Sequence, residues 1–286
     1  MTKTYNEIYI KTRRTLKDAG VEGCDLEARL LISAAAGKTV QALLRDMKLY
    51  AAEGLEEQVS AWVQRRIAGE PVAYITGTWE FFDTELTITP DVLIPRADTE
   101  VLARAAVTLF KGRNTHPRIL DLCCGSGCIG CSLALHMPAA RVIMVDIDPA
   151  ALRVCRENIL RYNFGPRVLC LDADATKKPP VLLGDFDLIV CNAPYIPSGD
   201  IAGLDPMVRD YEPIRALDGG EDGLAIIRPV ISLWKRVLRD RGVLMLEICE
   251  GQSEAVQSLL EEAGFEDIRA LEDFGGCERV VMARLP

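Results

Sequence analysis

Apolar positions recur with a helical spacing over about the first seventy residues of the chain. Tyr5, Ile8, Thr12 and Leu16 lie three or four residues apart, which predicts a helix that ends at Gly20. The same spacing predicts three further helices, over 26–36 with Asp25 as N-cap, from Thr39 as N-cap through Leu44, and over 55–68 before Gly69. We therefore expect residues 1–72 to form a small helical domain.

The segment from Tyr74 to Thr89 is instead rich in β-branched and aromatic residues. The sequence Phe82-Asp83-Thr84 at its centre is compatible with a turn, and prolines at 90 and 95 end the segment. This pattern predicts a β-hairpin, within residues 73–92, that links the helical domain to the rest of the chain.

From about residue 99 onward, short apolar runs alternate with helical segments. Strands are expected over 118–122, 141–146, 168–172, 186–190, 242–248, 266–271 and 279–284. Helices are expected over 129–136, 149–163, 224–239 and 254–263. Such alternation is typical of a Rossmann-like α/β domain, here residues 93–286, built on a parallel, doubly wound sheet. Sheets of this kind bind ligands at the carboxyl ends of their strands.

Composition and charge narrow the class of protein. With 286 residues, of which 49% are apolar and 26% charged, the chain is typical of a globular protein with two domains. No apolar run is long enough for a membrane span, and the N-terminus lacks the apolar core of a signal peptide. The net charge of −9 argues against stable nucleic-acid binding, which needs a basic face. Most of the ten cysteines lie in apolar runs, so we expect a reduced, cytoplasmic protein.

The segment 119–131 is rich in glycine and cysteine and is compatible with three chemistries. The motif Gly125-x-Gly127-x-x-Gly130 matches the dinucleotide fingerprint, with Asp146 at the spacing of a ribose-binding acid. The motif Cys124-x-x-x-Cys128-x-x-Cys131 matches the iron–sulfur ligands of radical enzymes that use S-adenosylmethionine. Small core cysteines on a helix explain that spacing better, so we expect no metal.

Carboxylates at the ends of three successive predicted strands favour the third chemistry. Asp121 and Asp146 end the first two of these strands, and Asp172 and Asp174 follow the third. S-adenosylmethionine carries an ammonium, a sulfonium and a ribose diol that such carboxylates can bind, whereas Asp121 would repel a pyrophosphate. The glycines let the backbone approach a ligand closely. Aspartates that only cap helices are the alternative interpretation.

The sequence Cys191-Asn192-Ala193-Pro194-Tyr195 follows the predicted strand 186–190. Pro194 fixes its own φ and favours an extended conformation at Ala193, which aims the Ala193 carbonyl. The Asn192 side-chain carbonyl lies beside it, so two acceptors can each bind one hydrogen of an NH₂ group, and Tyr195 offers a flat face. These acceptors would turn an amide nitrogen toward a methyl donor and stabilise the charge that develops on it. An ordinary Asn-Pro turn is the alternative.

Several motifs together resemble the class I S-adenosylmethionine-dependent protein-(glutamine-N5) methyltransferases, and within them the release factor glutamine methyltransferase family. The matching segments are Arg66–Gly77, Val92-Leu-Ile-Pro-Arg-Ala-Asp-Thr-Glu100, Leu217-Asp-Gly-Gly-Glu-Asp-Gly-Leu224, Leu246-Glu-Ile248 and the Asn192 motif. The resemblance covers nearly the whole chain. It implies a mostly parallel Rossmann-like sheet with an antiparallel last strand, a helical N-terminal domain for substrate recognition, and a hairpin linker.

The resemblance also implies a reaction and a set of site residues. The family transfers a methyl group from S-adenosylmethionine to the glutamine of the Gly-Gly-Gln motif in class-1 peptide chain release factors, and we expect a monomer that does the same. The implied substrate site is Asn192, Ala193, Pro194 and Tyr195, with Asn192, Pro194 and Tyr195 as the catalytic group. The expected cofactor contacts are Asp121, Cys123, Cys124, Gly125, Ser126, Gly127, Asp146, Asp174 and Asn192.

Two positions depart from the family's pattern. Ala193 stands where the family usually has proline, which removes a lock on φ but keeps the backbone carbonyl. Cys123 stands where the family has the first loop glycine, so a positive φ there would be strained by about 1 kcal/mol or more.

Other interpretations stay open at this point. A similar motif marks DNA adenine-N6 methyltransferases, which flip a base out of the duplex, and a related family methylates a glutamine of a ribosomal protein. A binding module that has lost methyl transfer is a third class. Arg96 and Glu100 would either orient the substrate or form a salt bridge at the domain junction. His116 and His136 lie outside every motif.

Overall fold

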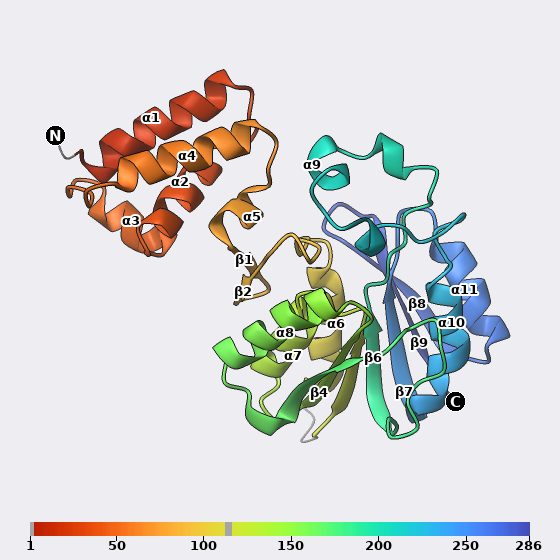
Figure 1. The fold of residues 1–286 in the computed structure, drawn as a ribbon. Coiled ribbons are helices and arrows are strands. Elements are labelled where there is room, and N and C mark those ends of the chain that lie inside the picture. The colour runs from red at the N-terminus through yellow and green to blue at the C-terminus, as the bar shows by residue number, and fades with distance from the viewer. Residues whose placement is uncertain (1–2, 112–115) are drawn as a thin grey trace. The chain divides into compact units, whose positions relative to one another are not determined.

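The computed structural model describes residues 3–111 and 116–286, which form two compact units (Figure 1). The first unit contains the residues up to Thr78 together with the later segment Asp205–Tyr211. The second unit contains Trp79–Leu204 and Glu212–Pro286. None of the helices described has both the length and the apolar character needed to cross a bilayer.

The N-terminal unit is a helical bundle. Its helices are α1 (Tyr5–Asp18), α2 (Cys24–Ala35), α3 (Val40–Asp46), α4 (Leu55–Ile67) and the short α5 (Val72–Thr76). The predicted apolar face of α1 is buried at Ile8 and Leu16, and Leu31 of α2 and Leu43 of α3 are buried as well. A buried ion pair adds to this core, in which Arg66 Nε lies 2.6 Å from Glu27 Oε2.

Of the two N-caps predicted in this bundle, one is confirmed and the other is wrong. Thr39 caps α3, since its hydroxyl accepts from the Ala42 backbone N–H at 3.1 Å. The prediction of Asp25 as the cap of α2 is wrong, because the helix begins two residues earlier, at Cys24, and Gly23, with φ +67°, is its N-cap. Asp25 instead lies in the first turn and forms an ion pair with Arg13 at 3.0 Å.

The segment that returns to this unit contains α9 (Pro206–Arg209). Tyr211, just after it, donates its hydroxyl hydrogen to the Ala68 carbonyl at 3.0 Å. A four-residue helix has no hydrophobic period to detect, so the sequence does not predict it.

The predicted hairpin is confirmed over a shorter span than expected. Its strands are β1 (Thr78–Phe81) and β2 (Thr84–Thr87), and residues 72–76, expected to be partly in the hairpin, form α5 instead. The turn residues Phe82 and Asp83 both have a positive φ, of 42° and 64°. A two-residue turn of this type matches the twist of the strands.

The predicted Rossmann-like α/β fold is confirmed in the second unit, whose sheet has the order β5-β4-β3-β6-β7-β9-β8. The strands are β3 (Arg118–Leu122), β4 (Arg141–Asp146), β5 (Val168–Asp172), β6 (Phe186–Cys191), β7 (Leu238–Glu247), β8 (Glu266–Glu272) and β9 (Glu278–Arg284). The pairs from β5 to β7 are parallel, and β9 runs antiparallel to both neighbours, as expected for the last strand.

Helices cover both faces of this sheet (Figure 1). They are α6 (Glu100–Phe110), α7 (Cys128–His136), α8 (Pro149–Arg161), α10 (Ile227–Pro229) and α11 (Ser253–Glu262), with short helices η1 (Gly165–Arg167), η2 (Ile201–Gly203) and η3 (Ile214–Ala216) in loops. Asp121 of β3 accepts from Gly130 of α7, whereas its neighbours Leu120 and Leu122 pack with residues of α10 and α11. Because successive strand residues face opposite sides, α7 and α11 lie on opposite faces.

The predicted continuous helix over 224–239 is wrong. The chain forms α10, then a π-helical turn η4 (Val230–Trp234), then a 3₁₀ turn η5 (Lys235–Val237), and β7 begins at Leu238 rather than at 242. Pro229 lacks a backbone N–H, which interrupts a regular helix. Trp234 is fully buried and donates its indole N–H to the Ala175 carbonyl at 2.9 Å, which fixes the irregular segment on the sheet.

Candidate active site

A cavity of about 570 Å³ opens at the carboxyl ends of β3, β4, β5 and β6. This is where a doubly wound sheet binds its ligands, and the volume suits a small molecule. Of the predicted site residues, those on its wall are Arg96, Cys123, Cys124, Gly125, Ser126, Asp146, Asp174, Asn192 and Pro194.

The loop after β3 forms one wall of the cavity in a left-handed conformation. Cys123, Gly125 and Gly127 have φ values of 57°, 53° and 78°. Cys123 therefore has the positive φ at which a residue other than glycine is strained, at a cost of about 1 kcal/mol or more. A Cβ atom on Gly127 would lie 2.9 Å from Cys155 Sγ, so glycine is needed there for packing as well. Gly127 itself does not line the cavity.

Two of the three aspartates expected to contact the cofactor lie on the cavity wall. Asp146, at the end of β4, accepts from the Gly125 backbone N–H at 2.8 Å and from the Asp148 N–H at 2.9 Å. Burial raises the pKa of Asp146. Asp174 accepts from the Thr176 hydroxyl at 2.6 Å and from its N–H, and these hydrogen bonds lower the pKa of Asp174. The cavity thus carries acidic groups near two strand ends.

Asp121 lies below the cavity rather than on its wall. Its side chain is fully buried, and Oδ2 accepts from the Gly130 backbone N–H of α7 at 2.8 Å. Its other oxygen has no hydrogen-bond partner among the residues the structure describes. Burial, followed by the nearby charge of Asp146, raises the pKa of Asp121 to about 7. Asp121 therefore contacts α7, and it is not among the residues that line the cavity.

Asn192 lies at the rim of the cavity directly after β6. Its side-chain nitrogen donates to the Thr99 hydroxyl oxygen at 3.3 Å. Ala193, next to it, is 2% exposed and does not line the cavity, whereas Pro194 does. The amide nitrogen of Asn192 is thus bound within the protein, which leaves its oxygen to accept from a ligand.

Tyr195 is directed toward a buried carboxyl group. Its hydroxyl donates to Glu247 Oε1 at 3.3 Å, and burial raises the pKa of Tyr195. Tyr195 does not line the cavity, so the flat face predicted for substrate binding is not on the cavity wall.

The loop 217–224 holds the backbone of the Asn192 motif. The Gly219 N–H donates to the Ile196 carbonyl at 2.8 Å, and the Gln252 side chain donates to the Tyr195 carbonyl at 2.9 Å. A Cβ atom on Gly223 would lie 2.2 Å from the Tyr195 carbonyl oxygen. The glycines of this loop therefore allow a close backbone contact that positions the motif.

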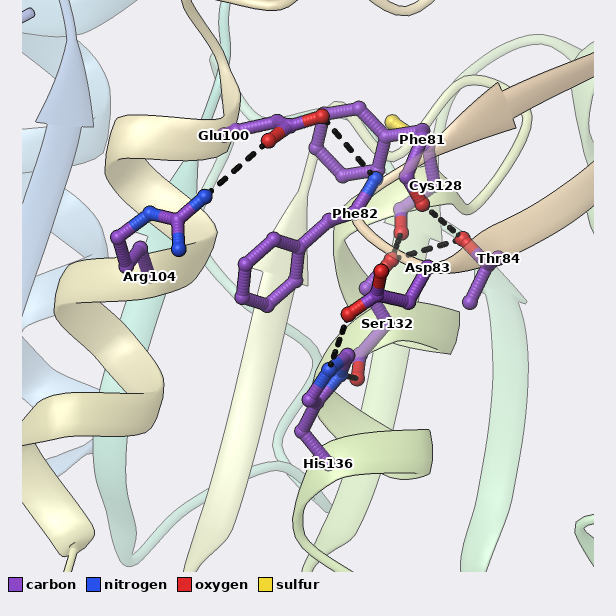
Figure 2. A network of polar contacts seen from close by, with 9 residues as sticks. All are labelled: Phe81, Phe82, Asp83, Thr84, Glu100, Arg104, Cys128, Ser132 and His136. Atoms are coloured by element: carbon purple, nitrogen blue, oxygen red, sulfur yellow. Dashed lines mark hydrogen bonds and ion pairs between the residues drawn. The ribbon is translucent and has the colours of Figure 1, made fainter. Parts of the chain in front are cut away.

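Arg96 and Glu100 are both in ion pairs, and only Arg96 lines the cavity. Arg96 pairs with the buried Glu212, which also accepts from the Ile94 backbone N–H at 3.1 Å. Glu100 accepts from the Phe82 backbone N–H and pairs with Arg104, at 3.3 Å in each case (Figure 2). Of the two roles expected for Glu100, substrate orientation or a salt bridge, the structure shows an ion pair, together with a hydrogen bond that holds the turn of the hairpin.

His136 completes this hairpin contact. Its ring lies 4.5 Å from the Phe82 ring, and its Nε2 is 3.2 Å from Asp83 Oδ2 (Figure 2). Ser132, one helical turn earlier on α7, lies 3.0 Å from the Thr84 hydroxyl. The hairpin turn is thus fixed on α6 and α7.

The cysteines of the loop and α7 pack as thiols. Cys131 is fully buried, and burial raises the pKa of its thiol. Within residues 3–111 and 116–286, no group of three His, Cys, Asp or Glu residues is placed to hold a metal ion.

Sequence reasoning assigned no role to three residues that the structure joins to the site. Thr99 contacts Asn192, Glu247 contacts Thr99 and Tyr195, and Arg215 of η3 lines the cavity and pairs with Asp148 at 3.1 Å. Thr99 and Glu247 stand inside the quoted family motifs, which was the available signal.

The fold and the site together define a methyltransferase. The family model described as "Methyltransferase small domain" matches residues 99–203, and the family model described as "PrmC N-terminal domain" matches residues 7–77. A methyltransferase structure from Pyrococcus furiosus has the same fold, with a TM-score of 0.53 at 15% identity, over 79% of this chain and 98% of that one.

Curated relatives identify the family. The chain is 39% identical to the release factor glutamine methyltransferase of Geobacter sulfurreducens, over 99% of this chain and 97% of that protein. It is 35% identical to that of Clostridium acetobutylicum, over 96% of each. The chain belongs to the release factor glutamine methyltransferase family.

Proposed function

We propose that this protein transfers a methyl group from S-adenosylmethionine to the side-chain amide nitrogen of the glutamine in the Gly-Gly-Gln motif of class-1 peptide chain release factors. The observation that carries the proposal is the placement of Asn192 at the cavity rim, with its amide nitrogen bound to Thr99 and its oxygen left to accept. The names of the relatives in the same family support the choice of substrate.

The residues of the cavity fit S-adenosylmethionine. Asp146 and Asp174 can accept from the donors of the ribose and amino-acid parts, and the left-handed loop 123–127 lets backbone atoms approach the ligand. When bound, S-adenosylmethionine supplies a methyl group made electrophilic by its sulfonium. The acidic wall disfavours a pyrophosphate, which weakens the dinucleotide alternative.

The substrate amide must be oriented because its lone pair is delocalised into the carbonyl group. The Asn192 oxygen, on the cavity wall, can accept one N–H of the amide, and the backbone carbonyl of the buried Ala193, between the lining residues Asn192 and Pro194, can accept the other. Together they would turn the nitrogen toward the methyl donor. The same two acceptors stabilise the positive charge that develops on nitrogen, so no general base is required before transfer. The methylated nitrogen then releases one proton to solvent, which leaves the neutral N-methyl amide. Pro194 favours an extended Ala193 and so fixes the second acceptor.

The remaining assignments extend this proposal. We place substrate recognition in residues 1–72, a linker in 73–92 and methyl transfer in 93–286, in a monomeric cytoplasmic protein without stable nucleic-acid binding. The net charge of −9 supports the last point.

The test uses methyl-labelled S-adenosylmethionine with a release factor. Asn192→Ala should lower turnover at least about 100-fold, the scale seen when a single preorganised transition-state donor or acceptor is lost. Gln257→Ala is the matched control, since this amide of α11 donates to Ser253 Oγ at 3.0 Å and is not among the residues that line the cavity. Turnover by a folded Asn192→Ala protein at the control's level would contradict the mechanism. Label on duplex DNA or on a ribosomal protein, and none on the release factor, would show that the proposed substrate is wrong.

A further inference from the structure

Four polar side chains form a continuous hydrogen-bonded chain that runs from the cavity wall, at Asn192 and Thr99, to the buried Glu247 and Tyr195. The Thr99 hydroxyl donates to Glu247 Oε1 at 3.1 Å, and the Tyr195 hydroxyl donates to the same oxygen at 3.3 Å. The Asn192 side-chain nitrogen donates to the Thr99 oxygen at 3.3 Å. Thr99 and Glu247 are 1% and 2% exposed, so water does not compete for these contacts.

The ionised Glu247 sets the direction of every hydrogen bond in this chain. A carboxylate accepts only, so the one hydrogen of the Thr99 hydroxyl is used toward Glu247. The Thr99 oxygen can then only accept from Asn192, and within an amide only the nitrogen donates. The Asn192 oxygen must therefore face away from Thr99, where the substrate amide needs an acceptor.

A reversed chain would place the wrong group at the site. Without an acceptor below it, the Thr99 hydroxyl is free to donate to the Asn192 oxygen, and the Asn192 amide can turn over. Its NH₂ group would then face the NH₂ group of the substrate, donor against donor. An amide turned this way cannot activate the substrate nitrogen.

Glu247, like Asp121, is a buried carboxyl with no ion-pair partner within the described parts of the chain, 3–111 and 116–286. Its Oε2 atom also has no hydrogen-bond partner among those residues. A buried, unpaired carboxylate reduces stability, so its presence next to the site points to a functional reason.

We propose that Glu247 is a positioning residue that acts through Thr99 to fix which end of the Asn192 side-chain amide faces the substrate. The expected effect on turnover rests on the proposed function, because it is measured as methylation of a release factor. The hydrogen-bond order itself is a property of the protein alone, and it can be measured without a substrate.

The charge state of Glu247 gives this chain a pH dependence. Burial raises the pKa of Glu247 to about 7. Five titratable or charged groups interact with Glu247. They are Asp98 before α6, Cys128 of α7, Cys191 of β6, Tyr195 after β6 and Arg279 of β9. Once protonated, Glu247 can itself donate, and the fixed order of the chain is lost.

The activity test compares two conservative changes at Thr99. Thr99→Ser keeps the hydroxyl, and turnover should stay within about twofold of the wild-type value. Thr99→Val keeps the shape but removes the hydroxyl, and kcat should fall about tenfold or more while KM for the release factor changes little. Adding Glu247→Gln to Thr99→Val should lower kcat no further, because the relay is already broken. Equal turnover of folded Thr99→Ser and Thr99→Val proteins would overturn the proposal.

A second measurement separates this inference from the proposed function. The side-chain NH₂ signals of Asn192 are followed by ¹H–¹⁵N NMR from pH 5 to 9 in wild type, Thr99→Val and Glu247→Gln. We expect a shift with a midpoint near the Glu247 pKa in wild type that both variants lack. The same pH response in all three proteins would overturn the relay, whether or not release factors are methylated. An inactive wild-type protein that shows the expected NMR response would overturn only the proposed function.

Discussion

At the scale of single residues, Cys123 shows how a local departure from a family pattern is accommodated. It adopts φ +57° with a Cβ atom, where glycine would be unstrained. The loop keeps its left-handed shape because Gly125 and Gly127 continue it and the Gly125 N–H is bound to Asp146. The cost therefore falls on stability rather than on the shape of the cavity.

This account predicts that Cys123→Gly raises the free energy of unfolding by about 0.5–1 kcal/mol, since relief of strain exceeds the added chain entropy. Urea unfolding at pH 7.5 measures it. Cys128→Gly is the control, because Cys128 lies in α7 and glycine there should lower stability by about 1 kcal/mol. A destabilised Cys123→Gly protein would argue that the thiol contributes packing that outweighs the strain.

The second departure, Ala193, predicts an effect on rate. Proline at this position would lock φ and restrict Asn192 to extended geometry, so Ala193→Pro should raise kcat about two- to fivefold. Ala193→Gly, which loosens the same bond, should lower kcat. Steady-state assays on both variants measure the difference, and an unchanged or lower rate for Ala193→Pro would show that this backbone is already rigid.

Two buried carboxyls predict how stability depends on pH. The folded-state pKa of Asp121 and of Glu247 is about 7 in each case, well above the ordinary carboxyl values. Between those ordinary values and about pH 7 the folded protein holds protons that the unfolded chain has released, so stability falls as pH rises through this range. Glu247→Gln should therefore flatten the fall between pH 5 and 8 by roughly 1–3 kcal/mol. A fall of the same size in this variant would place the titration elsewhere.

At the scale of elements, the accuracy of prediction follows the strength of the pattern. Strands β4 and β5 were predicted with the bounds observed, because a continuous apolar run between polar residues defines them. The prediction of one helix over 224–239 was wrong. The helical spacing of its apolar residues does not show that Pro229 interrupts the backbone hydrogen bonds of the helix. Helix α6 was not placed at all, and the return of 205–211 to the N-terminal unit has no signal in local sequence.

The loop 217–224 gives the sharpest test at this scale. Gly223 has φ +75°, and a Cβ atom there would lie 2.2 Å from the Tyr195 carbonyl oxygen. Gly223→Ala should displace the Asn192 motif and lower kcat at least tenfold. Gly199→Ala is the matched control, because no heavy atom of the described residues, apart from Gly199 and its two chain neighbours, lies within 4 Å of its Cβ position. Equal rates for the two variants would mean that the loop does not position the motif.

At the scale of the whole molecule, the sequence defined the fold class and the chemistry but not the support of the site. Alternating strands and helices predicted the sheet, and the Asn192 motif predicted an amide-binding site at its edge. The chain from Asn192 through Thr99 to Glu247 joins residues that are 93 and 148 positions apart. Such contacts depend on the order of strands in the sheet, which local patterns do not specify. The same limit explains Asp121 and Glu100, whose side chains face α7 and the hairpin rather than the cavity.

The most direct measurement of the central claim is the position of the methyl group on the product. The full-length protein is incubated with S-adenosylmethionine and a class-1 release factor, and the release factor is digested and mapped by fragmentation mass spectrometry. We expect one methyl group on the side-chain nitrogen of the Gly-Gly-Gln glutamine, absent when Asn192→Ala replaces the wild-type protein. A methyl group on any other residue, or an unmodified glutamine with S-adenosylmethionine bound to the protein, would contradict the account.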